Sequence, residues 1–169
     1  MPDEVMQAGE WYCSVVSLYE GRLVRFATRI TGDVEQARDV VQEAFLRLHA
    51  QNGSRPDNVQ AWLYTVCRRR ALDVLRKETR MKSLDNGAAI CESPLPSQPT
   101  ALEQHETEDQ IVRLLGELPA NQQEVVRLKF QEGLSYRDIA EVTGLSVTNV
   151  GYLLHVAIKK LREQLSTDE

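Results

Sequence analysis

The sequence predicts an all-α protein built from two small helical domains that are joined by a flexible linker, with a helix-turn-helix in the second domain. Apolar residues recur every three to four positions over most of the chain, and no segment alternates as a half-buried strand does. Residues 83–102 show neither pattern and contain three prolines, Pro94, Pro96 and Pro99. We therefore expect domains at 1–82 and 103–169, separated by an acidic linker at 83–102.

Three helices are expected in the first domain. The first ends at Gly32-Asp33, and Asp33 with Gln36 matches a capping box that opens the second. The second helix carries an apolar stripe from Val40 to Leu48 and stops before Pro56. The third is expected from about Val59 to Arg80. Its inward residues are predicted to be Trp62, Leu63, Val66, Ala71, Val74 and Leu75.

The second domain should begin with a helix from about Glu103 to Glu117. Pro119 suits the first turn of the next helix, which ends at Gly133. The inward residues of that second helix are predicted to be Val125, Val126, Leu128 and Phe130.

Residues 135–161 have the spacing of a DNA-binding helix-turn-helix. Ser135 and Asp138 form a plausible capping pair, Gly144 stands where the turn needs positive φ, and Ser146 caps the second helix. The DNA-binding candidates on this helix are Ser146, Thr148, Asn149, Tyr152, His155 and Lys159. An ordinary helical hairpin is the alternative. The fixed offsets of the Ala, Gly, Leu and Val residues in this segment favour the DNA-binding interpretation.

The net charge of −5 conceals two opposite blocks. Residues 61–82 hold seven basic residues against two acidic ones, whereas residues 83–110 hold six acidic residues and no basic one. Because salt screens charges beyond about 10 Å, a partner meets the local block rather than the total. The basic block therefore keeps nucleic acid open as a partner of an acidic chain.

The same sequence argues against several other classes of protein. No apolar run is long enough to span a bilayer, and the acidic N-terminus does not resemble a secretory signal, so we expect a cytoplasmic protein without membrane insertion. Three scattered cysteines and three distant histidines predict neither a disulfide framework nor a metal site. No nucleophile motif or phosphate loop is present, so we expect neither an enzyme nor a cofactor.

The third helix combines clustered arginines with an aromatic pair. Arg69, Arg76 and Arg80 fall near one face at steps of seven and four. Arginines neutralise phosphates and aromatic rings stack on unpaired bases. The candidates for a nucleic-acid surface here are Trp62, Tyr64, Arg68, Arg69, Arg76 and Arg80. The alternative places Trp62 and Tyr64 in the core beneath a solvated basic face.

Taken together, these blocks resemble a bacterial RNA polymerase sigma factor of the extracytoplasmic-function type (group 4). Segment 23–49, "LVRFATRITGDVEQARDVVQEAFLRLH", is similar to the polymerase-binding part of sigma domain two, and segment 61–76, "AWLYTVCRRRALDVLR", to its promoter-melting part. Segment 115–162 resembles sigma domain four. The resemblance runs from about Leu18 to Leu165, with both blocks in the expected order.

The resemblance implies a function and a set of partners. The chain would bind core RNA polymerase, direct it to specific promoters and help to melt the minus-ten region. Asp39, Gln42, Glu43 and Phe45 would dock on the polymerase clamp helices, and the second domain would bind the flap and the minus-thirty-five element. The resemblance also implies an anti-sigma factor as a further partner.

Two departures from the family pattern affect DNA recognition. The chain has Arg69 where many members carry Asn in the melting helix. The recognition helix has uncharged residues at four positions that are usually basic: Gly151, Leu153, Val156 and Ile158. Leu153, Val156 and Ile158 would then offer an apolar surface to a protein. A free-standing helix-turn-helix regulator, or a sigma-like protein with weak or altered DNA recognition, is the alternative function.

Overall fold

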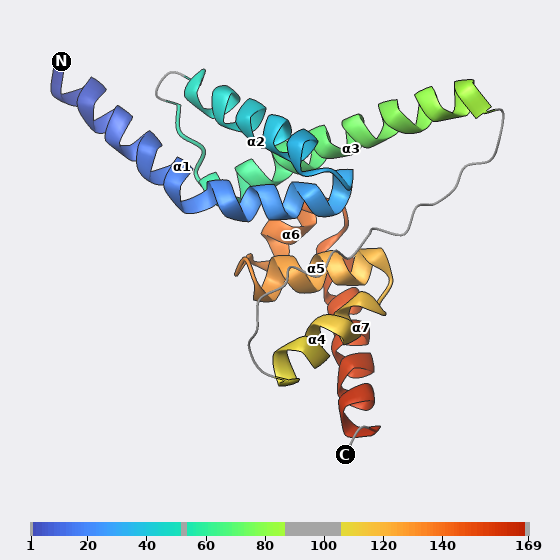
Figure 1. Ribbon diagram of the computed structural model, residues 1–169. Helices are drawn as coiled ribbons and strands as arrows, with labels where there is room; N and C mark the ends of the chain where they lie inside the picture. The colour runs from blue at the N-terminus through green and yellow to red at the C-terminus, as the bar shows by residue number, and fades with distance from the viewer. Residues whose placement is uncertain (1, 52–53, 87–105, 168–169) are drawn as a thin grey trace. The chain divides into compact units, whose positions relative to one another are not determined.

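The computed structural model describes residues 2–51, 54–86 and 106–167, and all the regular structure within these ranges is α-helical (Figure 1). The chain divides into two units, Met1–Leu95 and Pro96–Glu169. The helices are α1 (Pro2–Thr31), α2 (Val34–His49), α3 (Val59–Asn86), α4 (Glu106–Gly116), α5 (Ala120–Phe130), α6 (Tyr136–Thr143) and α7 (Val147–Thr167). The predicted all-α class with two helical domains is confirmed.

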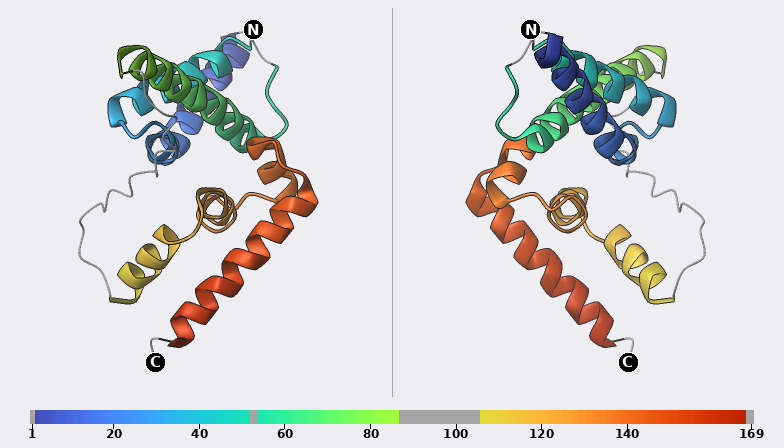
Figure 2. Two further views of the ribbon diagram at one scale, coloured as in Figure 1. Left: turned by 90° about the vertical axis from the view of Figure 1, so that its right-hand side faces the viewer. Right: turned by 90° about the vertical axis from the view of Figure 1, so that its left-hand side faces the viewer.

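In the first unit, α1, α2 and α3 pack against one another (Figures 1 and 2). Their apolar faces form the core of this unit. The buried residues include Leu23, Phe26, Ala27, Val40, Val41, Ala44, Phe45, Leu48, Leu63, Tyr64, Cys67 and Ala71. Burying one such Leu, Val or Phe side chain contributes roughly 1.5–3 kcal/mol. The core therefore fixes the outward faces of α2 and α3, which carry the predicted functional residues.

The junction between α1 and α2 follows from Gly32 and Asp33. Gly32 has φ +75°, which ends α1, and Asp33 Oδ1 accepts a hydrogen bond from the Gln36 backbone N–H at 2.8 Å. The second half of the predicted capping box is wrong, because the Gln36 side chain donates to Glu78 of α3 instead. The Asp33 N–H donates to Thr31 Oγ1 at 3.3 Å.

The third helix is longer than predicted, and its inward face is rotated. It continues to Asn86, so the first four residues of the predicted linker are helical. The rest of the predicted linker, residues 87–102, lies outside the described ranges. Ala61, Tyr64, Cys67 and Ala71 face the core. Trp62, Val66, Val74 and Leu75 were predicted to face inward but are only half-buried. The last turns of α3 extend beyond α1 and α2 (Figure 1).

In the second unit, α4, α5 and α6 pack on or beside α7. Pro119 is the N-cap of α5 rather than part of its first turn. The core contains Leu115, Leu118, Val125, Leu128, Leu134, Ile139, Val150 and Leu154. Phe130 was predicted to face inward, but 64% of its surface is exposed. Phe130 is the last residue of α5 and stands two positions after the fully buried Leu128, so it lies on the opposite side of the helix from the core.

Candidate polymerase-docking and nucleic-acid surfaces

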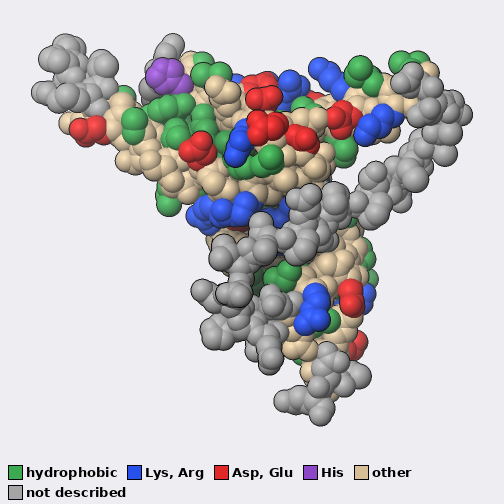
Figure 3. Space-filling model, in the orientation of Figure 1, with side chains coloured by type: hydrophobic (Ala, Val, Ile, Leu, Met, Phe, Trp, Pro, Cys, Tyr) green, Lys and Arg blue, Asp and Glu red, His purple; other side chains and the backbone are tan. Residues whose placement is uncertain are grey.

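The outward face of α2 carries two of the predicted polymerase-binding residues. Asp39 and Gln42 are exposed, and they flank the buried residues Val40 and Val41. Leu46, one turn beyond Gln42, is also exposed. Figure 3 shows acidic and basic side chains interspersed over the face of the unit that carries α2 and α3. This face presents a carboxylate and an amide to solvent.

Phe45 was predicted as a polymerase contact, but its side chain does not belong to this outward face. Its side chain is only 6% exposed. Its ring meets the Tyr12 ring edge-on, with 6.5 Å between centroids, and its carbonyl accepts a hydrogen bond from the Tyr12 hydroxyl at 3.0 Å. The aromatic ring is therefore part of the packing between α1 and α2.

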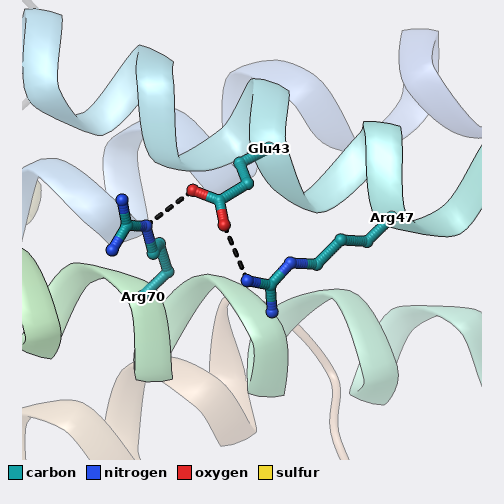
Figure 4. A network of polar contacts seen from close by, with 3 residues as sticks. All are labelled: Glu43, Arg47 and Arg70. Carbon is teal, nitrogen blue, oxygen red and sulfur yellow. Dashed lines mark hydrogen bonds and ion pairs between the residues drawn. The ribbon is translucent and has the colours of Figure 1, made fainter.

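Glu43 is held by two arginines inside the first unit (Figure 4). Arg70 Nε of α3 donates to one carboxylate oxygen at 2.6 Å, and an Arg47 terminal nitrogen donates to the other at 2.7 Å. Burial alone would raise the pKa of Glu43, but the hydrogen bonds and charges of Arg70 and Arg47 outweigh it and lower that pKa. The carboxylate is thus ionised and already paired.

The predicted basic surface on α3 is largely available to a partner. Arg69, Arg76 and Arg80 are exposed, and their spacing of seven and four residues places them on one side of the helix. Arg76 has a solvent-exposed partner in Asp73 at 3.6 Å, which is a weak surface pair. Arg68, also a predicted contact, is half-buried. Three guanidinium groups therefore line one accessible face.

The two aromatic candidates on α3 have different positions. Trp62 is half-buried, so part of its ring surface is accessible. Tyr64 is fully buried and packs against Phe26 with 5.0 Å between ring centroids and an interplanar angle of 63°. Tyr64 therefore has the core position that the alternative interpretation gave it, and its ring cannot stack on a base while the core is intact.

The helix-turn-helix of the second unit is built as its local sequence dictates. Ser135 and Asp138 form a complete capping box at the start of α6, and Gly144 ends that helix with φ +75°. Ser146 Oγ then accepts the Asn149 backbone N–H at 3.1 Å and caps α7. The remaining predicted DNA contacts, Thr148, Asn149, Tyr152, His155 and Lys159, are all exposed.

Leu153 is buried, as the inward apolar pattern of this helix predicts, so it does not join Val156 and Ile158 on an apolar partner surface. One contact of α7 was not expected from the sequence. Gly151 lies beneath the ring of Tyr136, with Tyr136 Cε2 3.6 Å from the position that a Cβ would take. Lys129 Nζ lies 5.4 Å from the centre of the same ring. The Tyr136 ring of α6 thus lies beside the position where Gly151 lacks a side chain. No pattern within α7 predicts this contact.

The described ranges carry no arrangement that suggests metal chemistry. They contain no group of three or more His, Cys, Asp or Glu residues that could hold a metal ion. None of their helices is long and apolar enough to cross a membrane. Cys13 is exposed and Cys67 is buried, and both are free thiols.

The comparisons with known proteins agree with this two-part layout. The family model described as Sigma-70 region 2 matches residues 15–81, and the one described as Sigma-70, region 4 matches residues 108–161. The first match covers α3 up to Met81 and the whole of α2, and the second contains the helix-turn-helix. The exposed arginines of α3 and the exposed predicted DNA contacts of α7 thus fall in the two matched regions.

Similar proteins align with most of the chain. The sigma factor SigL of Mycobacterium tuberculosis is 34% identical over 83% of this chain and 80% of its own length. SigV of Bacillus subtilis is 26% identical over 86% and 85%. In the structure of the sigma factor RpoE with the anti-sigma factor NepR from Bartonella quintana, RpoE is 26% identical, with a TM-score of 0.68 over 94% of this chain and 98% of that one. The chain belongs to the extracytoplasmic-function family of sigma factors, which are promoter-specific subunits of bacterial RNA polymerase.

Proposed function

We propose that α2 docks this sigma factor on core RNA polymerase through its outward face, led by Asp39 and Gln42. Both side chains are exposed on the face opposite the core, and they suit a basic partner surface by charge complementarity. In the family pattern this surface belongs to the clamp helices, and the second unit binds the flap. The exposure of a carboxylate and an amide together on α2 supports this docking.

In the same proposal, α3 holds the minus-ten region of promoter DNA as it opens. The observation that supports this role is the row of exposed arginines on one side of α3, Arg69, Arg76 and Arg80. Three phosphate contacts on single-stranded DNA would give a salt dependence of roughly −2 in log K against log salt. Trp62 is the one predicted aromatic that keeps accessible ring surface for an unstacked base.

The second unit would contact the minus-thirty-five element through α7. Asn149 suits adenine, and Thr148 and Tyr152 suit phosphates or base edges. Lys159 and Lys160 are exposed but lie further along the helix. Because charge is sparse at the start of α7, we expect this contact to add less affinity than the arginine row of α3.

An anti-sigma factor is the further partner that we propose. RpoE from Bartonella quintana was solved in complex with the anti-sigma factor NepR, and its fold matches 94% of this chain. A protein that binds both the polymerase-docking and DNA-binding surfaces would keep the sigma factor inactive. We propose a cytoplasmic location, where core polymerase and promoter DNA are found.

The experiment separates promoter opening from polymerase binding. Arg69→Ala and Arg76→Ala should each reduce open-complex formation by about tenfold or more, the scale of a lost charged hydrogen bond, while leaving polymerase affinity nearly unchanged. Lys82→Ala is the matched control, since Lys82 is an exposed cation of α3 on the side opposite Arg69 and Arg76. Equal loss of polymerase binding and opening, or an equal effect of the control, would contradict the proposed role.

A further inference from the structure

Two polar contacts tie the docking helix α2 to the melting helix α3. The Gln36 side-chain amide donates to Glu78, and Arg70 Nε donates to Glu43 at 2.6 Å. Gln36 and Glu43 follow one another along α2, whereas their partners run in the opposite order along α3. The two ties therefore fit helices that pass each other in opposite directions, and they lie about 10–12 Å apart at 1.5 Å of rise per residue.

The ion pair between Glu43 and Arg70 is partly shielded from solvent and should persist in the folded protein. The side chains of Glu43 and Arg70 keep only 35% and 32% of their surface exposed, well below the surface pairs of this chain. The lowered pKa keeps the Glu43 carboxylate charged, and Arg47 occupies the oxygen that Arg70 leaves (Figure 4). The carboxylate that the sequence assigned to polymerase thus already has two internal partners.

We infer that Glu43 and Arg70 form a positioning pair for promoter opening, in which neither needs to touch polymerase or DNA. The inference rests on the proposed roles of α2 and α3. The pair fixes the register of α3 against α2, so the row of Arg69, Arg76 and Arg80 keeps a constant orientation to Asp39 and Gln42. A slip of α3 by one residue would turn that row by about 100° around the helix.

The pair predicts a pattern of coupling that direct contacts would not give. If Glu43 bound polymerase, its loss would lower polymerase affinity, and the loss of Arg70 would not. If Arg70 bound DNA, its loss would lower opening, and the loss of Glu43 would not. A positioning pair makes both single losses alike, and the second loss then adds nothing because the tie is already broken.

The experiment is a double-mutant cycle with two readouts, polymerase affinity and open-complex formation. Glu43→Gln and Arg70→Gln should each lower opening by about three- to tenfold, the range for a charged hydrogen bond that is partly exposed to solvent. Polymerase affinity should stay within about twofold, and the double variant should match the single ones. Asp39→Asn should lower polymerase affinity. In the double variant of Asp39→Asn and Arg70→Gln, the separate losses of open-complex formation should multiply.

Arg47→Gln separates positioning from general stabilisation. It removes an ion pair to the same carboxylate at 2.7 Å, but that pair lies within α2 and does not reach α3. A stabilising role predicts equal effects of Arg47→Gln and Arg70→Gln, whereas a positioning role predicts loss of opening only for Arg70→Gln. Multiplicative losses in the cycle, or equal effects of the two arginine variants, would overturn the inference. Failure of the unaltered protein to open any promoter would instead overturn the proposed function.

Discussion

Two glycines of the helix-turn-helix should respond in opposite directions to the same substitution by alanine. Gly151 lies inside α7, and a Cβ at this position would lie 3.6 Å from Tyr136 Cε2, which is ordinary van der Waals contact. Gly144 ends α6 with φ +75°, a backbone conformation that alanine adopts only with strain. Gly151→Ala should therefore stabilise the second unit, and Gly144→Ala should destabilise it.

The magnitudes follow from the backbone at each position. Alanine in a helix interior is about 0.8–1 kcal/mol more favourable than glycine, and nothing at Gly151 opposes the added methyl group. A left-handed conformation costs a residue with a Cβ about 1–2 kcal/mol, and no atom lies within 4 Å of a Cβ at Gly144 to compensate or to worsen this. The two variants should differ by about 2–3 kcal/mol in the free energy of unfolding.

Amide hydrogen exchange at Val150 and Leu154 measures this difference locally, because both residues are buried in α7. Exchange limited by unfolding of the unit should slow by about four- to fivefold in Gly151→Ala and accelerate by about five- to thirtyfold in Gly144→Ala. Tryptophan fluorescence supplies the internal control. Both tryptophans, Trp11 and Trp62, lie in the first unit, whose unfolding should not change.

Faster exchange in Gly151→Ala would refute the reasoning, because it would mean that Tyr136 and α7 approach too closely for a methyl group. Unchanged exchange in Gly144→Ala would show that the turn between α6 and α7 does not need a left-handed residue. Either result would place the recognition helix differently from the arrangement described above.

Three further substitutions test the packing that positions the two surfaces. Burial raises the pKa of the Cys67 thiol from 9.0 to about 12, so the folded protein disfavours its ionisation. The free energy of unfolding should fall by up to about 1.4 kcal/mol per pH unit between about pH 9 and 12. Urea titrations across this range should show a shallower fall in Cys67→Ala, and identical slopes would contradict the burial. Asp138→Ala breaks the capping box of α6 and should cost about 1 kcal/mol, measured by hydrogen exchange of α6; protection equal to that of the unaltered protein would argue against the box. Tyr12→Phe removes the hydroxyl donor to the Phe45 carbonyl. The free energy of unfolding of the first unit, measured in urea, should fall by about 0.5–1.5 kcal/mol. An unchanged free energy of unfolding would show that this hydrogen bond is no better than one to water.

The helix-turn-helix was predicted almost residue by residue because its signals are local. The Ser135–Asp138 capping box, the left-handed Gly144 and the Ser146 cap each depend on residues within three positions of one another. The end of α1 at Gly32 is predictable for the same reason. Backbone hydrogen-bonding needs at helix ends dictate these residues, and no tertiary contact has to be known.

The orientation of α3 was harder to predict because its pattern allows more than one inward face. Trp62 and Tyr64 are both aromatic and two positions apart, and only packing against Phe26 of α1 decides that Tyr64 is the buried one. The polar ties follow the same rule. Arg70 meets Glu43 across 27 positions of sequence, and no spacing within α2 or α3 predicts that contact.

Contacts outside the family-like segments were also missed. Trp11 and Tyr12 precede the region-2 match, which starts at residue 15. Tyr12 nevertheless packs against His49 with 5.1 Å between ring centroids, and Arg55 lies 4.4 Å from the Trp11 ring. These pairs brace the end of α2 and the segment before α3 against α1. Such long-range aromatic contacts leave no periodic trace in the sequence.

Run-off transcription on genomic fragments tests the central assignment most directly. The purified chain is added to bacterial core RNA polymerase, and the transcripts are compared with those made by core polymerase alone. We predict discrete transcripts that start at defined sites and appear only when the chain is present. Binding to polymerase without any such transcript, or binding to DNA without polymerase, would contradict a promoter-specificity subunit.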